Sequence, residues 1–401
     1  MRKILLGTSA LCAVAMAGPA FAQSANEPVK LGIGGYWNSA YGDMVSQSGA
    51  SKNGKRSDDI ETDAVLNFKG STKLDNGLTV GLSVQMRAEN QVPSASVSPN
   101  LTTATPDTVK RSYAYIKSAF GEVRIGDDDD ARRQKAMTAP VAGPLFGANT
   151  PDLGMSNGPA LTNTTMRKLE GEKRVSRLAY FTPTIAGFSF AVSYAPGGEK
   201  GSAGPSFQPN NVPNQNVNVV NNAVSVAGSY SGKFGDFGLD GYAGASTGHR
   251  VYAAPFVAGN VSGRDNPTAI SGGAVLTFGP FAFGGAYEWL RDRDTPVIVG
   301  GASGGHQERN TWDVGARYTI GPFGISTDWT RAILQNRDGN SSGINDIVSL
   351  VGDYVLGPGI DVGAAVDFNH YKSNFSGAGT PPSGTGSYTG LALMAGLGIA
   401  F

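Results

Sequence analysis

The last segment of the chain, Tyr388–Phe401, alternates between large apolar side chains and small ones. One set of alternate residues includes Leu391, Leu397 and Phe401, whereas the interleaved set consists mostly of glycine and alanine. A β-strand places alternate side chains on opposite faces, so this segment predicts a strand with one bulky apolar face. A strand buried in a soluble sheet is also compatible with the pattern. The length of the segment and its recurrence along the chain favour a membrane-spanning strand.

The same period-two alternation recurs from Val29 onward, in segments separated in turn by short and long connections. Seven short connections, such as Leu74–Gly77 and Leu356–Gly359, contain Gly, Asn, Asp or Pro, which suit tight chain reversals. Fifteen connections in all predict sixteen strands, with both termini on the side of the short turns. The eight long connections are rich in Gly, Ser, Asn and Pro and cover residues 42–58, 91–107, 127–173, 197–218, 248–266, 291–309, 332–344 and 370–386.

The two faces of the predicted strands differ in chemistry. In 78–87, Leu, Val and Met alternate with Thr, Gly, Ser, Gln and Arg. A soluble β-sandwich shows the same local alternation. However, the segments are longer than ordinary strands, and aromatic residues lie near their ends as in an interfacial girdle. The sequence therefore predicts an all-β fold, a closed antiparallel transmembrane β-barrel whose polar inner face surrounds water.

The N-terminal stretch has the three parts of a secretory signal peptide. Arg2 and Lys3 precede an apolar run, and Ala20–Ala22 forms an A-x-A-like cleavage site. We therefore expect a signal peptide at 1–22 and a barrel domain at 23–401. Cleavage would remove Cys12, the only cysteine, and with it any disulfide or thiolate metal site. It would also leave 30 basic against 32 acidic residues, a balance that gives no indication of a nucleic-acid partner.

Several phrases in the chain resemble a known family. Phe120–Gly126, Tyr180–Phe190, the Leu356–Gly359 turn and the terminal Phe401 are similar to general porins of the Gram-negative outer membrane, in their proteobacterial branch. The resemblance implies a sixteen-stranded barrel with short periplasmic turns, long extracellular loops and a third loop folded into the pore. It also implies passive diffusion of small hydrophilic solutes and ions, contact with outer-membrane lipid, a homotrimer, and recognition of Phe401 by the outer-membrane assembly machinery. Ala139–Gly147 lacks the Glu of the corresponding family phrase, so the resemblance assigns no constriction acid there.

Charged residues at the narrow part of such a pore set its selectivity. Alternation places a stripe of bases on the inner face of the early strands, and in that register Tyr113 and Tyr115 face lipid. The acidic run that opens the longest loop would lie opposite the bases and create a transverse field. Any single base is equally compatible with a position outside the constriction, and the acidic run with a calcium-like patch or a solvated loop. The candidate pore residues are Lys69, Arg87, Lys110, Arg124, Arg177, Asp127, Asp128, Asp129 and Asp130.

Two other functions are compatible with an outer-membrane barrel. A lipase-like enzyme would need Ser and His together at a strand rim, but His249, His306 and His370 are all expected in the long connections. A non-conducting adhesion barrel would need bulky inward residues, whereas these faces are rich in Gly, Ala and Ser. We find no spacing typical of metal ligands and no phosphate-binding loop, so the sequence predicts neither catalysis nor a cofactor.

Overall fold

The computed structural model describes residues 29–48, 57–88, 109–148, 174–197, 219–251, 266–291, 307–336, 342–373 and 386–401. The expected signal peptide lies outside these residues. Within them, no helix is long and apolar enough to cross a membrane. The described chain forms sixteen strands and one short helix, α2 (Ala131–Lys135).

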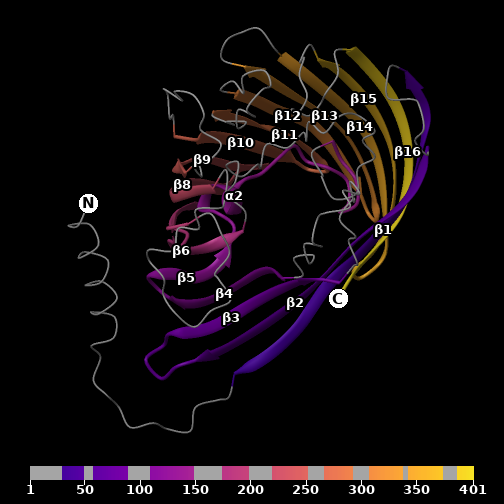
Figure 1. Cartoon of the computed structure of the whole chain (residues 1–401). Helices are drawn as coiled ribbons and strands as arrows, with labels where there is room; N and C mark the ends of the chain where they lie inside the picture. Colours follow the sequence, from indigo (N-terminus) through magenta and orange to yellow (C-terminus); the bar gives the residue numbers. More distant parts are fainter. Residues whose placement is uncertain are drawn as a thin grey trace, which may run out of the picture.

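The strands follow one another around a single sheet (Figure 1). Their bounds are β1 Lys30–Ser48, β2 Asp58–Lys73, β3 Thr79–Arg87, β4 Val109–Ser118, β5 Gly121–Asp128, β6 Val175–Phe181, β7 Phe188–Ala195, β8 Val219–Phe234, β9 Phe237–Val251, β10 Thr268–Phe278, β11 Phe281–Arg291, β12 Gln307–Ile320, β13 Phe323–Asn336, β14 Ser342–Gly357, β15 Ile360–Ser373 and β16 Gly386–Ala400.

Every strand pairs antiparallel with its neighbours in sequence, and β16 pairs with β1 to close the barrel. Beyond the end of β16, the Gly35 amide donates to the Phe401 carbonyl at 2.9 Å, and the Phe401 amide donates back at 3.1 Å. Closure leaves no free sheet edge, and an open edge is not tolerated in hydrocarbon. The predicted fold, a closed antiparallel barrel of sixteen strands, is confirmed.

The short turns lie where the sequence predicts them. Each contains a glycine with positive φ, for example Gly77 at +82° and Gly359 at +72°, a conformation that side chains with a Cβ rarely adopt. Several of the long connections are shorter than predicted, because the strands beside them continue past the end of the clear alternation. β1 runs on to Ser48, and His249 and His370 lie within β9 and β15 instead of in loops.

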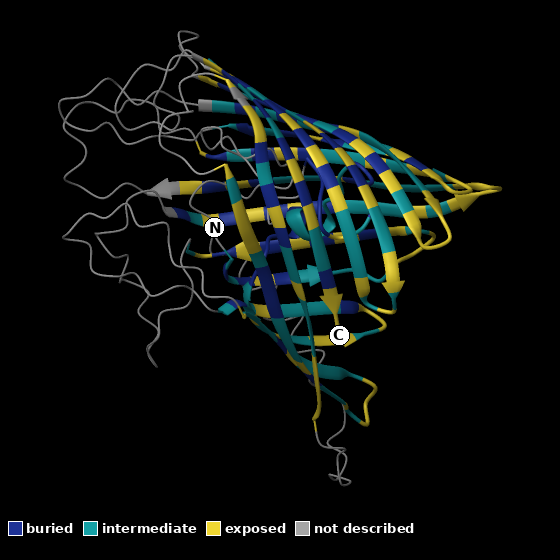
Figure 2. Ribbon diagram, turned by 90° about the vertical axis from the view of Figure 1, so that its right-hand side faces the viewer, coloured by how far each residue is buried: buried dark blue, intermediate teal, exposed yellow. Residues whose placement is uncertain are grey.

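Apolar side chains cover the outer face of the barrel. On β3, β5 and β6, Leu82, Ile125 and Leu178 are exposed, and neighbouring strands bring such residues into register. Exposed and buried residues alternate along the strands in Figure 2, as the period-two pattern predicts. An alternating chain with an exposed apolar outer face is the arrangement of a barrel that lies in lipid.

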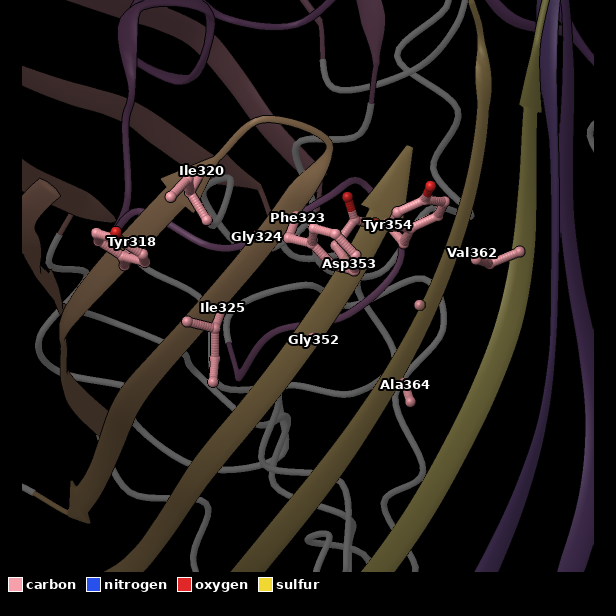
Figure 3. A pocket seen from close by; sticks show the side chains of 11 residues that line it. Tyr318, Ile320, Phe323, Gly324, Ile325, Gly352, Asp353, Tyr354, Val362 and Ala364 are labelled. Carbon is pink, nitrogen blue, oxygen red and sulfur yellow. The ribbon is translucent and has the colours of Figure 1, made fainter. Parts of the chain in front are cut away.

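Aromatic residues line an apolar groove on this outer face, beside the short turns. The Phe323 and Tyr354 rings, on β13 and β14, lie 4.6 Å apart between centroids, and Tyr318 on β12 lies beside them (Figure 3). Phe323 and Ile325 in its lining are exposed large apolar side chains, so the groove belongs to the membrane-facing surface and not to the lumen. This position agrees with the aromatic girdle predicted from the strand ends.

The two faces of β3 differ in their response to charge. Leu82→Arg places a cation on the outer face and should lower the free energy of unfolding by about 2–4 kcal/mol near the midplane. Gln85→Arg is the matched control, because Gln85 lies on the inner face and bonds Asn67 of β2 at 3.0 Å. Urea titrations in lipid vesicles measure both. Equal losses for the two variants would contradict the assignment of faces.

Candidate functional site

The segment after β5 turns into the barrel and lies against its inner wall. We call the described residues 129–148 of this segment the inner loop. Asp130 caps α2 by accepting a hydrogen bond from the Arg133 amide at 2.9 Å. The helix contacts β7, β8 and β9 from within the ring of strands (Figure 1). The side chains that it meets therefore identify the inner face of the sheet.

A row of serine hydroxyl groups accepts hydrogen bonds from the N-terminus of α2. The Ala131 amide donates to Ser193 Oγ at 3.0 Å, and the Arg132 amide donates to Ser225 Oγ at 2.9 Å. Ser193 and Ser225 are cross-strand partners, and Ser225 pairs in turn with Ser246 of β9. Small hydroxyls in register thus give the helix N-terminus acceptors for amides that have no partner within the helix.

The Arg132 side chain extends this contact over three further strands. Its Nε donates to Ser246 at 3.2 Å, and its Nη1 donates to Ser271 at 3.0 Å and to Glu288 Oε2 at 2.5 Å. Arg132 is fully buried and Glu288 is 1% exposed. A buried ion pair of this kind depends on its partners, because either charge alone would be costly to bury. Arg132 therefore fixes α2 against the β9–β11 wall.

Lys135 at the end of α2 points back to β7. Its Nζ donates to Ser189 Oγ at 2.6 Å. Burial lowers the pKa of Lys135, and the nearby positive charge of Arg124 lowers this pKa further. Two bases from different elements therefore lie close enough to influence one another at this side of the lumen.

Beyond the helix, the inner loop crosses to the wall formed by β12–β14. Its backbone amides donate to wall side chains: Ala139 to Asp313 at 2.5 Å, Ala142 to Ser326 at 2.8 Å, and Ala148 to Asp328 at 2.7 Å. These wall acids are almost fully buried under the loop. Asp313 also accepts from the Ala286 amide at 2.8 Å, so one carboxylate joins the loop to two strands.

The end of the described loop inserts apolar side chains against the wall. Leu145 and Phe146, 1% and 2% exposed, pack with a cluster from β1, β14, β15 and β16. Just before them, Gly143 has φ of +66° and lies so close to Asp353 that an added Cβ would be 2.0 Å from its Oδ1. The inner loop is therefore held at both ends, by polar contacts near Arg132 and by apolar packing near Phe146.

The predicted acids and bases meet on one wall instead of facing each other across the pore. Arg124 Nη1 donates to Asp128 at 3.1 Å and to Gln134 of α2 at 2.7 Å, and its Nε donates to Glu122 at 2.5 Å. Arg177 Nε donates to the Asp128 carbonyl at 2.8 Å. This correction has a topological cause: Asp128 ends β5, and Asp129 and Asp130 follow it directly, so all three stay beside the strands that carry the bases.

Three guanidinium groups surround the buried carboxylate of Asp129. Arg111 Nη2 lies 2.5 Å from Oδ2, Arg174 Nε 3.2 Å from Oδ2, and Arg133 Nε 3.4 Å from Oδ1. We call Arg111, Arg133 and Arg174 the arginine cluster. Their side chains remain 32%, 30% and 22% exposed, respectively. Sequence reasoning missed all three, because none lies at the expected inward position of a predicted strand.

A β-bulge explains why Arg111 was missed. The β3–β4 register shifts between Gln85 and Met86, which pair with Arg111 and Val109 and leave Lys110 extra. Lys110 still points inward and its Nζ contacts Asp63 at 3.3 Å, while Arg111 also reaches the lumen. A bulge adds one residue to one strand, so the parity of the following residues changes.

The same bulge overturns the expectation that Tyr113 and Tyr115 face lipid. Tyr115 pairs with Arg124 across β4 and β5, and the Arg124 guanidinium lies 4.8 Å from the Tyr113 ring centroid. Because Arg124 bonds α2, both tyrosines lie on the inner face. Their β4 neighbour Ile116 is exposed on the outer face instead.

The remaining candidates occupy other places. Asp127 lies on the same face of β5 as the exposed Ile125 and accepts from Ser176 Oγ at 2.6 Å, so the structure directs it away from the lumen. Lys69 lies on the inner face of β2, in register with Ser83, two strands away from β4. Arg87 ends β3 on that face. Phe401 is 65% exposed at the short-turn side of the barrel.

The wall opposite the bases is rich in acids. Around β4–β6, bases outnumber acids. The bases are Arg111, Arg124, Arg133, Arg174 and Arg177, and the acids are Glu122, Asp128 and Asp129. The strands β12–β15 lie across the ring from β4–β6 (Figure 1), and their register places more acids than bases on the inner face. These acids are Asp313, Asp328, Asp353, Asp361 and Asp367. The structure therefore has bases on one wall and acids on the other, and these acids are strand residues and not the predicted Asp127–Asp130 run.

Of the three histidines, His249 and His370 lie within the described residues, and His306 lies outside them. Within the described part of the chain, no three His, Cys, Asp or Glu side chains are grouped as metal ligands would be. His249 Nδ1 lies 3.2 Å from Asn266 Oδ1, and His370 is paired in register with Asp346 on the outer face. The side chains that line this part of the lumen are mainly charged and aromatic.

Comparisons with known proteins agree with this architecture. The family described as Gram-negative porin matches residues 7–374. A major outer membrane protein, P.IB of Neisseria gonorrhoeae, is 28% identical over 190 residues, which are 47% of this chain and 46% of that protein. The match therefore spans about half the length of this relative.

Solved structures of low sequence identity share the fold. An anion-selective porin from Comamonas acidovorans is 17% identical with a TM-score of 0.55, and the match covers 93% of this chain and 100% of that one. The trimer form of OmpT, an outer membrane protein of Vibrio cholerae, is 10% identical with a TM-score of 0.54, over 94% and 100% of the two chains.

Proposed function

The chain belongs to the Gram-negative porin family, and on that premise we propose that it forms a water-filled channel for passive diffusion of small hydrophilic solutes and ions. The observation that carries the proposal is the charged inner loop, which lies within a closed barrel along its polar inner wall. A pore acts by the charges at its narrow part and requires no catalytic group. Family membership favours this function over a lipase-like barrel or a non-conducting adhesion barrel.

The barrel lies in the outer membrane, as do the relatives of this family. We propose in addition that residues 1–22 are the export signal and are absent from the mature protein. Mass determination of protein purified from outer membranes tests this proposal. An intact N-terminus would contradict it.

We further propose that three copies assemble into a homotrimer. Support comes from the trimer form described for OmpT of Vibrio cholerae, which has the same fold. Native mass spectrometry of the protein released from lipid into mild detergent would give the number of chains. A uniform monomer under these conditions would contradict the proposal.

The exposure of the charged groups supports a preference for anions. The side chains of the arginine cluster remain partly exposed. By contrast, the acids Asp313, Asp328 and Asp367 are buried, and two of them are covered by inner-loop amides. A permeating ion interacts most strongly with charges that it can approach without intervening protein. We therefore propose that anions pass more readily than cations of similar size.

Removing two exposed charges should reduce this preference. We expect the double variant Arg111→Gln/Arg174→Gln to shift the reversal potential in a KCl gradient towards the value for potassium, because less positive charge remains beside the permeation path. Lys73→Gln, an exposed base at the end of β2, is the control and should leave the potential nearly unchanged. An equal shift for both variants, or none for the double variant, would contradict the assignment of the arginine cluster.

We propose that the terminal aromatic residue is an assembly signal. Phe401 is 65% exposed, so its ring contributes little to the packing of the folded barrel. We expect Phe401→Asp to lower the amount of folded protein in the outer membrane several-fold, and Phe401→Tyr to keep it near the wild-type amount. Heat-modifiable mobility of outer-membrane fractions measures this amount. Wild-type levels of the Asp variant would refute the signal.

A further inference from the structure

Three aromatic rings lie on the inner wall beside the arginine cluster. Tyr113 and Tyr115 are adjacent inward residues of β4, with ring centroids 6.5 Å apart and planes tilted by 54°. Phe181 of β6 faces Glu122 in register, on the same face. All three are only partly buried. Apolar surface left against water in a lumen is costly, and an exposed patch of it indicates a binding role.

A glycine on the neighbouring strand leaves room for one of these rings. A Cβ at Gly81 of β3 would lie 2.4 Å from Tyr115 Cζ and 2.5 Å from its hydroxyl oxygen. Only glycine allows the ring to approach the strand this closely. The hydroxyl end of the Tyr115 ring therefore lies close to the backbone of β3.

A guanidinium group holds the other two rings in place. Arg124 lies 4.8 Å from the Tyr113 centroid and 4.4 Å from the Phe181 centroid. Its Nε and Nη1 are bonded to Glu122, Asp128 and Gln134, so the side chain has a fixed orientation. We call the three rings of Tyr113, Tyr115 and Phe181 the aromatic platform. Because its rings are held in place before a ligand arrives, binding loses little conformational entropy.

Cationic side chains lie beside this platform. Arg111 precedes Tyr113 by two residues on the same strand face, so their Cα atoms are separated by about 6.6–6.8 Å. The Arg111 side chain is 32% exposed and the Arg174 side chain is 22% exposed, and both guanidinium groups contact Asp129. If the carboxylate of a small ligand binds these guanidinium groups, a planar ring attached to that carboxylate would lie over the tyrosines.

We propose that this wall is a selective subsite for planar aromatic monocarboxylates, with the carboxylate at Arg111 and Arg174 and the ring against Tyr113 and Tyr115. The inference rests on the proposed channel function and adds a solute class to it. Guanidinium groups recognise carboxylates through paired hydrogen bonds, whereas aromatic rings prefer offset or tilted contact with another ring. An aliphatic carboxylate would use only the first of these contacts, and Glu122 and Asp128 oppose a second negative charge.

The test compares ligands of equal charge and similar size in planar bilayers. Benzoate is titrated against the chloride current of single channels, with cyclohexanecarboxylate as the non-aromatic control and acetate as the small control. We expect benzoate to reduce the current at concentrations about two- to tenfold lower than cyclohexanecarboxylate, the range that an aromatic contact adds. Equal potency of the two ring acids in the wild-type channel would overturn the inference.

Variants then assign the effect to the rings. Tyr113→Leu/Tyr115→Leu removes the aromatic faces and should abolish the difference between the two ring acids. Tyr113→Phe/Tyr115→Phe keeps the faces and should preserve it. A difference that persists in the Leu variant would place the subsite elsewhere and overturn the proposal.

Two failures are distinguishable. A wild-type channel that conducts KCl but does not discriminate between the ring acids contradicts the subsite alone. A wild-type protein without any conductance contradicts the proposed function and the subsite together. If the Leu variant does not fold, the wild-type comparison of the two ring acids still decides the question.

Discussion

Replacing Glu288 with alanine is expected to release α2 from the wall and to change the single-channel conductance. The change leaves the Arg132 guanidinium, which is fully buried, without the carboxylate 2.5 Å from its Nη1. Removing one partner of a buried pair costs about 3–5 kcal/mol, more than the neighbouring Ser246 and Ser271 hydroxyls can supply. Arg132 is then more stable in water than against the wall, so α2 should leave the wall. We therefore expect the single-channel conductance to differ from that of the wild type and the current to be noisier.

A charge-neutral double variant is the control for this experiment. Arg132→Met/Glu288→Met replaces the pair by apolar side chains of similar length, a change that is often neutral for stability. We expect it to keep α2 seated and the current steady, because the Ala131 and Arg132 amides still bond Ser193 and Ser225. A steady wild-type current in Glu288→Ala would show that the ion pair does not hold the loop.

The barrel follows from sequence because its main rule is local. Alternation decides which face of a strand meets lipid, and it depends only on residues two apart. The turn glycines, such as Gly77 and Gly359, likewise report a backbone conformation that is set within the turn. Strand number and antiparallel order therefore came out correctly, whereas strand ends did not, since side chains above the membrane need no apolar face.

The candidate site depends on non-local information that alternation does not contain. The bulge at Lys110 reverses the parity of β4, so Tyr113 and Tyr115 face the lumen although the sequence pattern directs them to lipid. Alternating apolar and polar residues cannot reveal such a shift when tyrosine suits either face. Arg124 and Arg177 do lie on the inner face, as alternation predicts, because the register between β5 and β6 contains no bulge.

The run Asp127–Asp130 shows how neighbours in sequence acquire different roles. Asp127 points outward from β5, whereas Asp128 at the end of the strand points inward and binds Arg124. Asp129 contacts the three residues of the arginine cluster, and Asp130 caps α2. Each role depends on where the strand ends and the helix begins. A row of serines in register, such as Ser193, Ser225 and Ser246, could have indicated where the helix docks, once the strand register was known.

Truncating Phe146 is expected to free the other end of the inner loop. The ring is 2% exposed and packs with apolar residues of β1, β14, β15 and β16, so Phe146→Ala should cost about 3–5 kcal/mol of loop-wall packing. Because this energy holds a loop and not the barrel, we expect the loss to appear as current fluctuations between levels, with urea unfolding of the barrel little changed. Single-channel recordings and urea titrations measure the two effects separately.

Phe368→Ala removes the same atoms from the outer face of β15, where the ring is 46% exposed to lipid, and it should leave the current steady. Phe146→Leu retains much of the buried volume and should fluctuate less than the Ala variant. The amides of Ala139, Ala142 and Ala148 would remain bonded to the wall in all three variants. Steady current in Phe146→Ala would mean that these three hydrogen bonds suffice. In that case, the apolar contact would add nothing to the position of the loop.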